Sequence, residues 1–78
     1  MSHKNDPGLD AWVGMSLRVR RVAAGLTLKQ FANKVGVTSA TVARWETDDN
    51  APTAQSVERI AEELQSKPQD FSRPPVIV

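Results

Sequence analysis

The chain contains no cysteine, no tyrosine and only one histidine, and it has no long apolar run. Without cysteine it can form neither a disulfide framework nor a thiolate metal site. Its apolar runs of a few residues are far shorter than the roughly 20 residues of a transmembrane helix. The opening stretch MSHKNDPG is polar, lacks the apolar segment of a secretory signal and holds the one histidine, His3. These absences predict a cytosolic protein without a metal or cofactor.

Charge is distributed unevenly along the 78 residues, which have room for one domain. The formal net charge is +1. Residues 11–45 hold six basic residues and no acidic one, whereas residues 46–70 hold seven acidic residues and two basic ones. Such a separation favours one face that meets a polyanion, although ordinary solvated helix faces give the same pattern.

Capping residues and apolar periodicity predict a first helix over residues 10–24. Asp10 is its expected N-cap, and Gly25 follows its last residue as a terminator. At helical spacing, its inner stripe consists of Val13, Leu17, Arg21 and Ala24. We therefore expect this helix to lie half-buried on the rest of the domain.

Two shorter helices are expected in the middle of the chain. Thr27 and Gln30 form a capping box at the start of a helix over residues 28–35, and Gly36 ends it. The next helix follows after a short turn and spans residues 38–46, with its first residue as the cap. Two helices joined by a tight turn that contains glycine are the plan of a helix-turn-helix.

The residue types between these two helices suit that plan. Ala32 is small at the expected helix crossing, where two backbones approach each other. The apolar residues that supply buried contacts in this unit are Phe31, Val35, Val37, Val42 and Trp45. We expect Trp45 to belong to the core and not to a surface for base stacking.

A fourth helix over residues 54–65 has the clearest apolar stripe of a half-buried helix. The stripe consists of Val57, Ile60, Ala61 and Leu64. Pro68 is expected to stop the helix, and the segment PQDF can form one more turn that docks Phe71 on the core. With no strand pattern before the last residues, the sequence predicts an all-α bundle of four to five helices over residues 10–71.

The two ends differ from this domain in composition. Residues 1–9 are expected to be a flexible arm. Residues 72–78, SRPPVIV, are expected to be extended, because two prolines and three β-branched residues disfavour a helix. This tail is either a loose end, or a strand that pairs with another copy or a partner protein.

Over residues 15–71 the sequence resembles the Cro and phage-repressor type of helix-turn-helix, also called the XRE family. The resemblance is carried by RRVAAGLTLKQFANKVGVTSATVARWE, by APTAQSVERIAEEL and by the trailing Phe71. It implies a lambda-repressor-like bundle that binds operator DNA, commonly as a two-fold dimer. It also implies a bacterial or phage protein associated with the nucleoid in the cytoplasm.

The family pattern pairs an arginine late in the first helix with the glutamate that closes the third helix, here Arg21 and Glu46. We interpret this pair as structural. Arg21 lies on the apolar stripe, where an unpaired guanidinium would be costly and a bidentate carboxylate resolves the cost.

The outward positions of helix 38–46 are then available to read bases. They are Ser39, Ala40, Thr41 and Arg44. Small residues let the helix enter a groove, a methyl such as that of Ala40 or Thr41 can contact a thymine methyl, and Arg44 can bind guanine or a phosphate. A solvated helix surface with one charge is the alternative interpretation.

Phosphate contacts are expected at the starts of helices 28–35 and 38–46, where backbone N–H groups are free. The residues expected to take part are Thr27, Leu28, Lys29, Thr38 and Thr47. Leu28 can contribute only its backbone N–H, since the family often has glutamine there. Arg18, Arg20 and Lys34 would add diffuse attraction or simply decorate the surface. Asp48 and Asp49 stand in a loop that is often basic in the family, and they would repel the duplex.

The leading hypothesis is sequence-specific binding of double-stranded DNA by a transcriptional regulator or repressor. A homodimer on a palindromic operator is expected, because one helix-turn-helix reads only a short half-site. The alternative is an antitoxin-like or adaptor module that docks a partner protein through the acidic helix 54–65 or through the tail. An enzyme is not expected, since the chain has no HExxH, phosphate-loop or GxSxG pattern.

Overall fold

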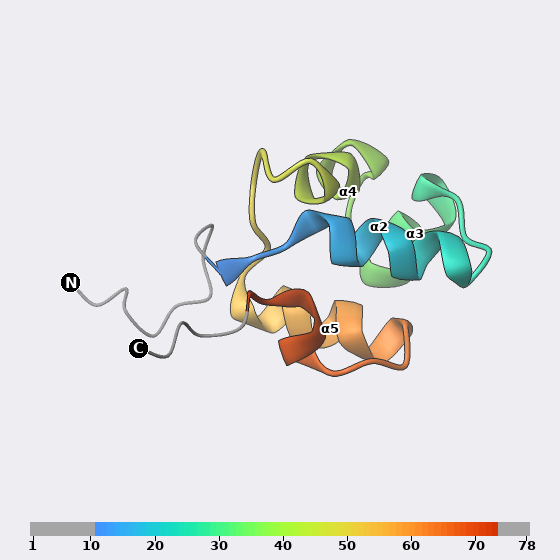
Figure 1. Cartoon of the computed structure of the whole chain (residues 1–78). Coiled ribbons are helices and arrows are strands. Elements are labelled where there is room, and N and C mark those ends of the chain that lie inside the picture. The colour runs from blue at the N-terminus through green and yellow to red at the C-terminus, as the bar shows by residue number, and fades with distance from the viewer. Residues whose placement is uncertain (1–10, 74–78) are drawn as a thin grey trace, which may run out of the picture.

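Four helices and a terminal 3-10 turn follow one another in the computed structural model, which describes residues 11–73. They are α2 (Gly14–Ala23), α3 (Leu28–Val35), α4 (Ser39–Glu46), α5 (Ala54–Glu63) and η2 (Pro68–Phe71) (Figure 1). The predicted all-α bundle is confirmed. Among the described residues no helix is long and apolar enough to cross a membrane. The arm over residues 1–9 and most of the tail lie outside the described residues.

Threonine caps start three of the helices. Thr27 Oγ1 accepts the backbone N–H of Gln30 at 3.0 Å, and the Gln30 side chain accepts the N–H of Thr27 at 2.9 Å, which is the predicted capping box. Thr38 and Thr53 cap α4 and α5 in the same way, through the N–H three residues later. Each cap satisfies an N–H that has no partner within the helix.

The first predicted helix corresponds to α2, which begins at Gly14 and not at the predicted residue 10. Val13 has an extended backbone, with φ −121° and ψ 100°, and α2 begins at Gly14. The reason lies in the tertiary structure. Trp12 forms an isolated antiparallel bridge with Ser72, and the N–H of Val13 donates to the carbonyl of Phe71 at 2.9 Å. Backbone that pairs with another segment cannot also pair along a helix.

Both ends of the domain therefore meet in this short pairing. The Arg73 N–H donates to the Ala11 carbonyl at 2.6 Å, so the first two residues of the predicted tail contact the segment that precedes α2. The tail was expected to lack a partner within the domain. Residues 72 and 73 have one, and residues 74–78 lie outside the described part of the chain.

The core is built from all four helices, from η2 and from the segment before α2. Its buried apolar residues are Trp12, Leu17, Phe31, Ala32, Val42, Trp45, Val57, Ile60, Ala61 and Phe71. Phe71 is fully buried at the end of η2, as the PQDF turn predicted. Ala24 is exposed, contrary to its place on the predicted stripe, because α2 ends at Ala23 and Leu26 packs on the core instead.

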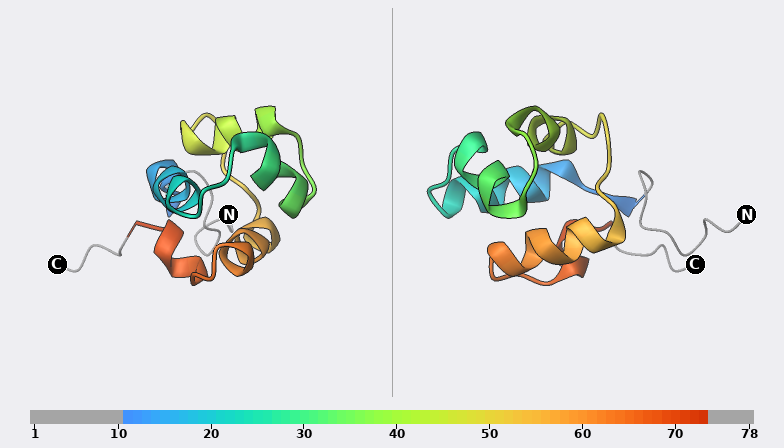
Figure 2. Two further views of the ribbon diagram at one scale, coloured as in Figure 1. Left: turned by 90° about the vertical axis from the view of Figure 1, so that its right-hand side faces the viewer. Right: turned by 180° about the vertical axis from the view of Figure 1, so that it is seen from behind.

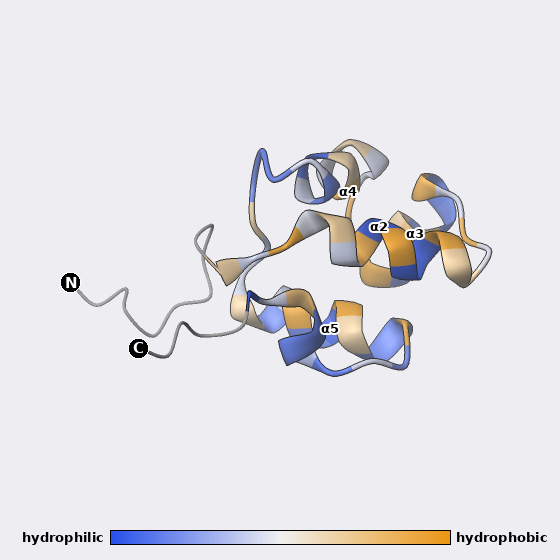
Figure 3. Ribbon diagram, in the orientation of Figure 1, coloured by the Kyte–Doolittle hydropathy of each residue, from blue (hydrophilic) through white to orange (hydrophobic). Residues whose placement is uncertain are grey.

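The fourth helix also ends earlier than predicted. Its last residue is Glu63, and a turn follows in which Gln65 has a positive φ of 53°. Pro68 therefore begins η2 and does not terminate α5. Figure 3 shows a hydrophilic stretch in the loop between α4 and α5, in contrast to the apolar stretches along the helices.

The arrangement of the helices leaves one side of α4 uncovered. In two opposite views α4 and α5 lie at opposite ends of the molecule, with α2 and α3 between them (Figures 1 and 2). The contacts agree, since α4 packs mainly on α3 and α2. A helix packed from one side only can present its other face to a ligand.

Candidate nucleic-acid interface

The turn between α3 and α4 is built by residues 36–38. Gly36 has a φ of +76°, a left-handed conformation that glycine adopts without a Cβ penalty, and it ends α3. The N–H of Val37 then donates to the Ala32 carbonyl at 3.0 Å. Thr38 follows directly as the cap of α4. This is the tight junction that the sequence predicted for a helix-turn-helix.

Two residues anchor α4 to the bundle. Val42 is fully buried and Trp45 nearly so. They are three positions apart, so they lie on the same side of the helix. The sequence predicted this pair of anchors, and together they set the rotation of α4 about its own axis.

The residues expected to read bases lie on the other side of α4. Ser39, Ala40 and Arg44 are exposed, and Thr41 is half-buried. The Thr41 hydroxyl shares a hydrogen bond with that of Thr38 at 3.0 Å, so its methyl group is held in place. Arg44 makes no ion pair with any described residue. Its guanidinium is therefore available to a ligand outside the domain.

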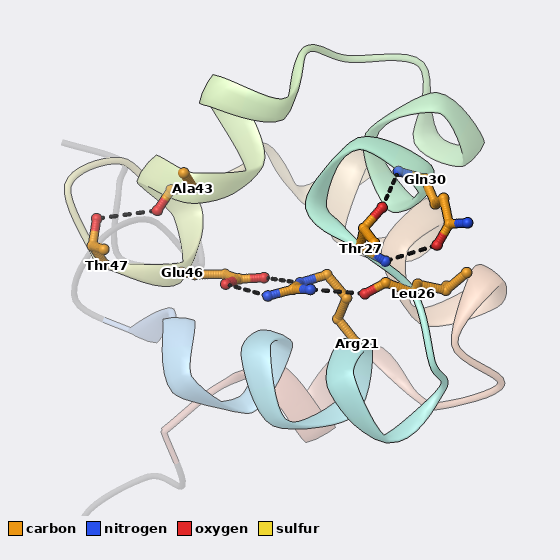
Figure 4. A network of polar contacts seen from close by, with 7 residues as sticks. All are labelled: Arg21, Leu26, Thr27, Gln30, Ala43, Glu46 and Thr47. Atoms are coloured by element: carbon orange, nitrogen blue, oxygen red, sulfur yellow. Dashed lines mark hydrogen bonds and ion pairs between the residues drawn. The ribbon is translucent and has the colours of Figure 1, made fainter.

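Arg21 and Glu46 meet at the C-terminal end of α4, as the resemblance implied. The Arg21 guanidinium donates from Nε and Nη2 to the two carboxylate oxygens, and from Nη1 to the Leu26 carbonyl at 2.8 Å (Figure 4). Arg21 is the one buried charged residue in the described part of the chain, with 9% of its surface exposed. The bidentate geometry satisfies a guanidinium that would otherwise be costly to bury.

A second contact to the end of α4 involves Trp12, which sequence reasoning missed. Its indole Nε1–H donates to the Trp45 carbonyl at 2.7 Å, and its ring stacks on Phe71 with centroids 6.0 Å apart. Trp12 is 2% exposed. The only sequence signal was a large aromatic residue near the start of a predicted helix.

A third contact requires the glycine at the start of α2. A Cβ on Gly14 would lie 2.3 Å from the Trp45 carbonyl oxygen and 2.5 Å from that of Glu46. The backbones of α2 and α4 therefore touch at this position. The signal in the sequence was a glycine inside a helical pattern, where alanine would be the better helix former.

One of the two aspartates in the acidic loop after α4 has a structural role. Asp48 has a left-handed φ of 64°, and its Oδ1 accepts the Gly14 N–H at 2.8 Å. A carboxylate at the N-terminus of a helix is stabilised by the helix dipole. Asp49 is exposed and makes no ion pair with any described residue.

The residues expected to contact phosphates lie at three helix ends. At the start of α3, Thr27 and Lys29 are exposed, and Leu28 is half-buried with its side chain packed on the core. Thr38 is exposed at the start of α4. Thr47 is exposed at the end of α4, where its hydroxyl donates to the Ala43 carbonyl at 3.2 Å (Figure 4).

Of the basic residues expected to add diffuse attraction, Arg20 has another role. Its guanidinium donates to the Ser66 hydroxyl at 3.1 Å, lies 3.9 Å from the Asp70 carboxylate and stands 5.7 Å from the centre of the Phe71 ring. These contacts link α2 to η2 and to the turn that precedes it. Arg18 and Lys34 are exposed and make no ion pair with described residues.

Residues 17–71 match the model of the helix-turn-helix family HTH_3. The chain belongs to this family. Membership confirms the predicted class of function, sequence-specific DNA binding by a transcription regulator. The HTH_3 domain occupies most of the chain, and it includes α3, the turn and α4. No curated protein matches the chain.

Solved structures share the fold. The phage P22 c2 repressor, in complex with a synthetic operator, is 22% identical over 74% of this chain and 88% of its own, with a TM-score of 0.72. An HTH_3 family transcriptional regulator from Vibrio cholerae is 27% identical, with a TM-score of 0.68, over 76% of this chain and 33% of its own. Hydroxypropylphosphonic acid epoxidase from S. wedmorenis is 28% identical, with a TM-score of 0.73, over 83% of this chain and 36% of its own. The chain thus spans about a third of the last two proteins.

Proposed function

We propose that this protein binds double-stranded DNA with α4 in the major groove and regulates transcription, most simply as a repressor that occupies an operator. The observation that supports this proposal most directly is that α4 has one buried side and one exposed side. Val42 and Trp45 are buried on one side, whereas Ser39, Ala40 and Arg44 are exposed on the other. A major groove admits one α-helix, and small side chains at its start allow close approach.

The base-reading roles follow from the chemistry of each side chain. The Ala40 and Thr41 methyl groups suit the C5-methyl of thymine. The Ser39 hydroxyl can donate to or accept from a base edge. Arg44 lies one turn further along and can donate two parallel hydrogen bonds to guanine O6 and N7. These four side chains would therefore set the preferred half-site.

Phosphate contacts would fix the register of α4 on the duplex. The caps leave the first backbone N–H groups of α3 and α4 free, at Leu28, Lys29, Ser39 and Ala40, because the caps take only the third N–H. Thr27, Lys29 and Thr38 flank these groups. Thr47 would contribute by exchanging its hydrogen bond to the helix for one to a phosphate. Such contacts position the protein but do not read sequence.

A homodimer on a palindromic operator is part of the proposal. One helix-turn-helix reads a short half-site, so useful affinity requires a second copy at about 34 to 36 Å along the duplex. The P22 c2 repressor shares this fold and is in complex with a synthetic operator, which supports DNA binding by this fold. The place of action would be bacterial or phage DNA at the nucleoid.

Selection from random duplex DNA, followed by sequencing, tests the proposal. The expected result is an enriched motif with two inverted half-sites, and a binding constant that falls steeply as salt rises, because condensed counterions leave the duplex. A pool that remains random after repeated rounds, or binding that does not respond to salt, would overturn it. The Ser39→Glu variant is the control, because a carboxylate on the outward face should abolish enrichment without touching the core.

A protein-interaction module remains the second candidate, and one observation favours it. The exposed side of α5 carries Glu58 and Glu62, which make no ion pair with described residues.

The tail is the other surface that could bind a partner protein. Removal of residues 74–78 spares the pairing of Ser72 and Arg73 with the N-terminal segment. Loss of association with a partner protein in this truncated chain, with DNA binding retained, would assign that role to the tail.

A further inference from the structure

Three large apolar side chains stand on the surface of α2. Met15 is 57% exposed, Val19 57% and Val22 58%, and they are the large exposed apolar residues in the described part of the chain. Their spacing of four and three positions places them in one row along the helix. We call this row the α2 stripe. Apolar residues scattered singly on a surface need no explanation, but a row on one helix does.

The α2 stripe lies on the side of α2 that faces away from the core. Leu17 and Arg21 are buried on the inner side of the same helix. The stripe borders a shallow groove lined by Met15, Arg18, Val19, Val22 and Ala23. In Figure 2 (left), α2 lies at the edge of the molecule across from α5. No residue of α4 lines this groove, so α4 can bind DNA without filling it.

The charge beside the groove has one sign. α2 carries three arginines and no acidic residue. Two of them are paired within the domain, Arg20 with Asp70 and Arg21 with Glu46. Arg18 lines the groove and has no ion pair with any described residue. The groove is thus lined by four apolar residues and one arginine.

We propose that the α2 stripe docks an acidic amphipathic helix of a partner protein. Such a helix would present apolar residues at i, i+3 or i+4 and i+7 to Met15, Val19 and Val22, and a carboxylate to Arg18. A second copy of this chain fits poorly, since a two-fold axis beside Val19 would bring two Arg18 guanidiniums together with no acidic residue of α2 between them. The stripe would link the DNA-bound domain to another protein.

A library of displayed helical peptides tests this proposal on the full chain. Selection on the wild-type protein, after subtraction on the Val19→Gln variant, is expected to enrich peptides with the apolar spacing above and with Asp or Glu on one flank. A synthetic copy of an enriched peptide should bind the Arg18→Glu variant at least 10-fold more weakly by fluorescence anisotropy. Replacing its acidic residues with Lys should restore binding to that variant.

Several results would overturn the proposal. They are enrichment of peptides without acidic residues, equal binding of the peptide to wild type and Arg18→Glu, and self-association of the wild type in sedimentation equilibrium that Val19→Gln abolishes. The last result would assign the stripe to a second copy. Both substituted side chains are exposed, so circular dichroism should show folded variants. Val19→Gln should bind the selected operator as the wild type does, which separates this proposal from the DNA-binding proposal.

Discussion

The Asp48 carboxylate accepts the backbone N–H of Gly14 at 2.8 Å, and so the loop that follows α4 caps the helix that precedes it by more than thirty residues. Asp48 and its neighbour Asp49 were both expected to repel a duplex. In the structure the two aspartates have different environments. Asp48 is held against the N-terminus of α2, and Asp49 points its charge into solvent without an ion pair to described residues.

The two aspartates should therefore respond differently to neutralisation. Asp48→Asn keeps an acceptor but loses the charge at the helix N-terminus, and the free energy of unfolding should fall by about 0.5 to 1 kcal/mol in urea titrations. Asp49→Asn should leave stability unchanged within about 0.5 kcal/mol. It should strengthen binding to all duplexes by removing like charge. Equal stability of the two variants would contradict the assigned role of Asp48.

Gly14→Ala should destabilise the domain although alanine is the better helix former by about 1 kcal/mol. The added Cβ would meet two backbone carbonyls, which cannot move as a flexible side chain can. We expect a net loss of about 2 kcal/mol or more in the free energy of unfolding, within the range of overpacked sites.

Gly25→Ala is a comparison variant that separates the cost of backbone strain from the cost of crowding. Gly25 has a positive φ of 76°, and a Cβ on Gly25 would meet no atom within 4 Å. The expected cost is about 1 to 2 kcal/mol, from the left-handed backbone alone. A Gly14→Ala protein as stable as the wild type would show that α2 and α4 do not approach each other so closely.

Arg21 and Glu46 should show strong coupling in a double-mutant cycle. Arg21→Met leaves a partly buried carboxylate without its partner and should cost about 3 to 5 kcal/mol. The double variant Arg21→Met, Glu46→Leu should lose much less than the sum of the two single losses, because neither charge remains unpaired. Urea unfolding followed by the fluorescence of Trp12 and Trp45 measures each corner. Additive losses would mean that the pair does not act as one unit.

Arg44→Ala should weaken binding to the selected operator by about 1 to 3 kcal/mol and relax the preference at one base position. The side chain is exposed, so stability should not change. Arg18→Ala is the control, since Arg18 lies on α2 and should change affinity little. An equal loss on every duplex, with preference unaltered, would make Arg44 a phosphate contact and not a base reader.

The local signals of the sequence were enough to place the helix-turn-helix. The capping box of Thr27, the left-handed Gly36 and the spacing of Val42 and Trp45 depend on residues at most four positions apart. Interactions of that range are encoded by neighbours in the chain, so periodicity and capping rules find them. The outward set on α4 then follows, because a helix with a fixed inner side has a fixed outer side.

The tertiary structure alone decided two further contacts that hold α4, and it decided where α2 begins. The bond from Trp12 to the Trp45 carbonyl and the cap from Asp48 to Gly14 join residues 33 and 34 positions apart. The pairing of Trp12 with Ser72 spans almost the whole domain. No pattern along the chain announces which distant groups will meet, since that depends on how the helices pack. Packing also paired Arg20 with Ser66 and Asp70, and it left Arg18 beside an open apolar row.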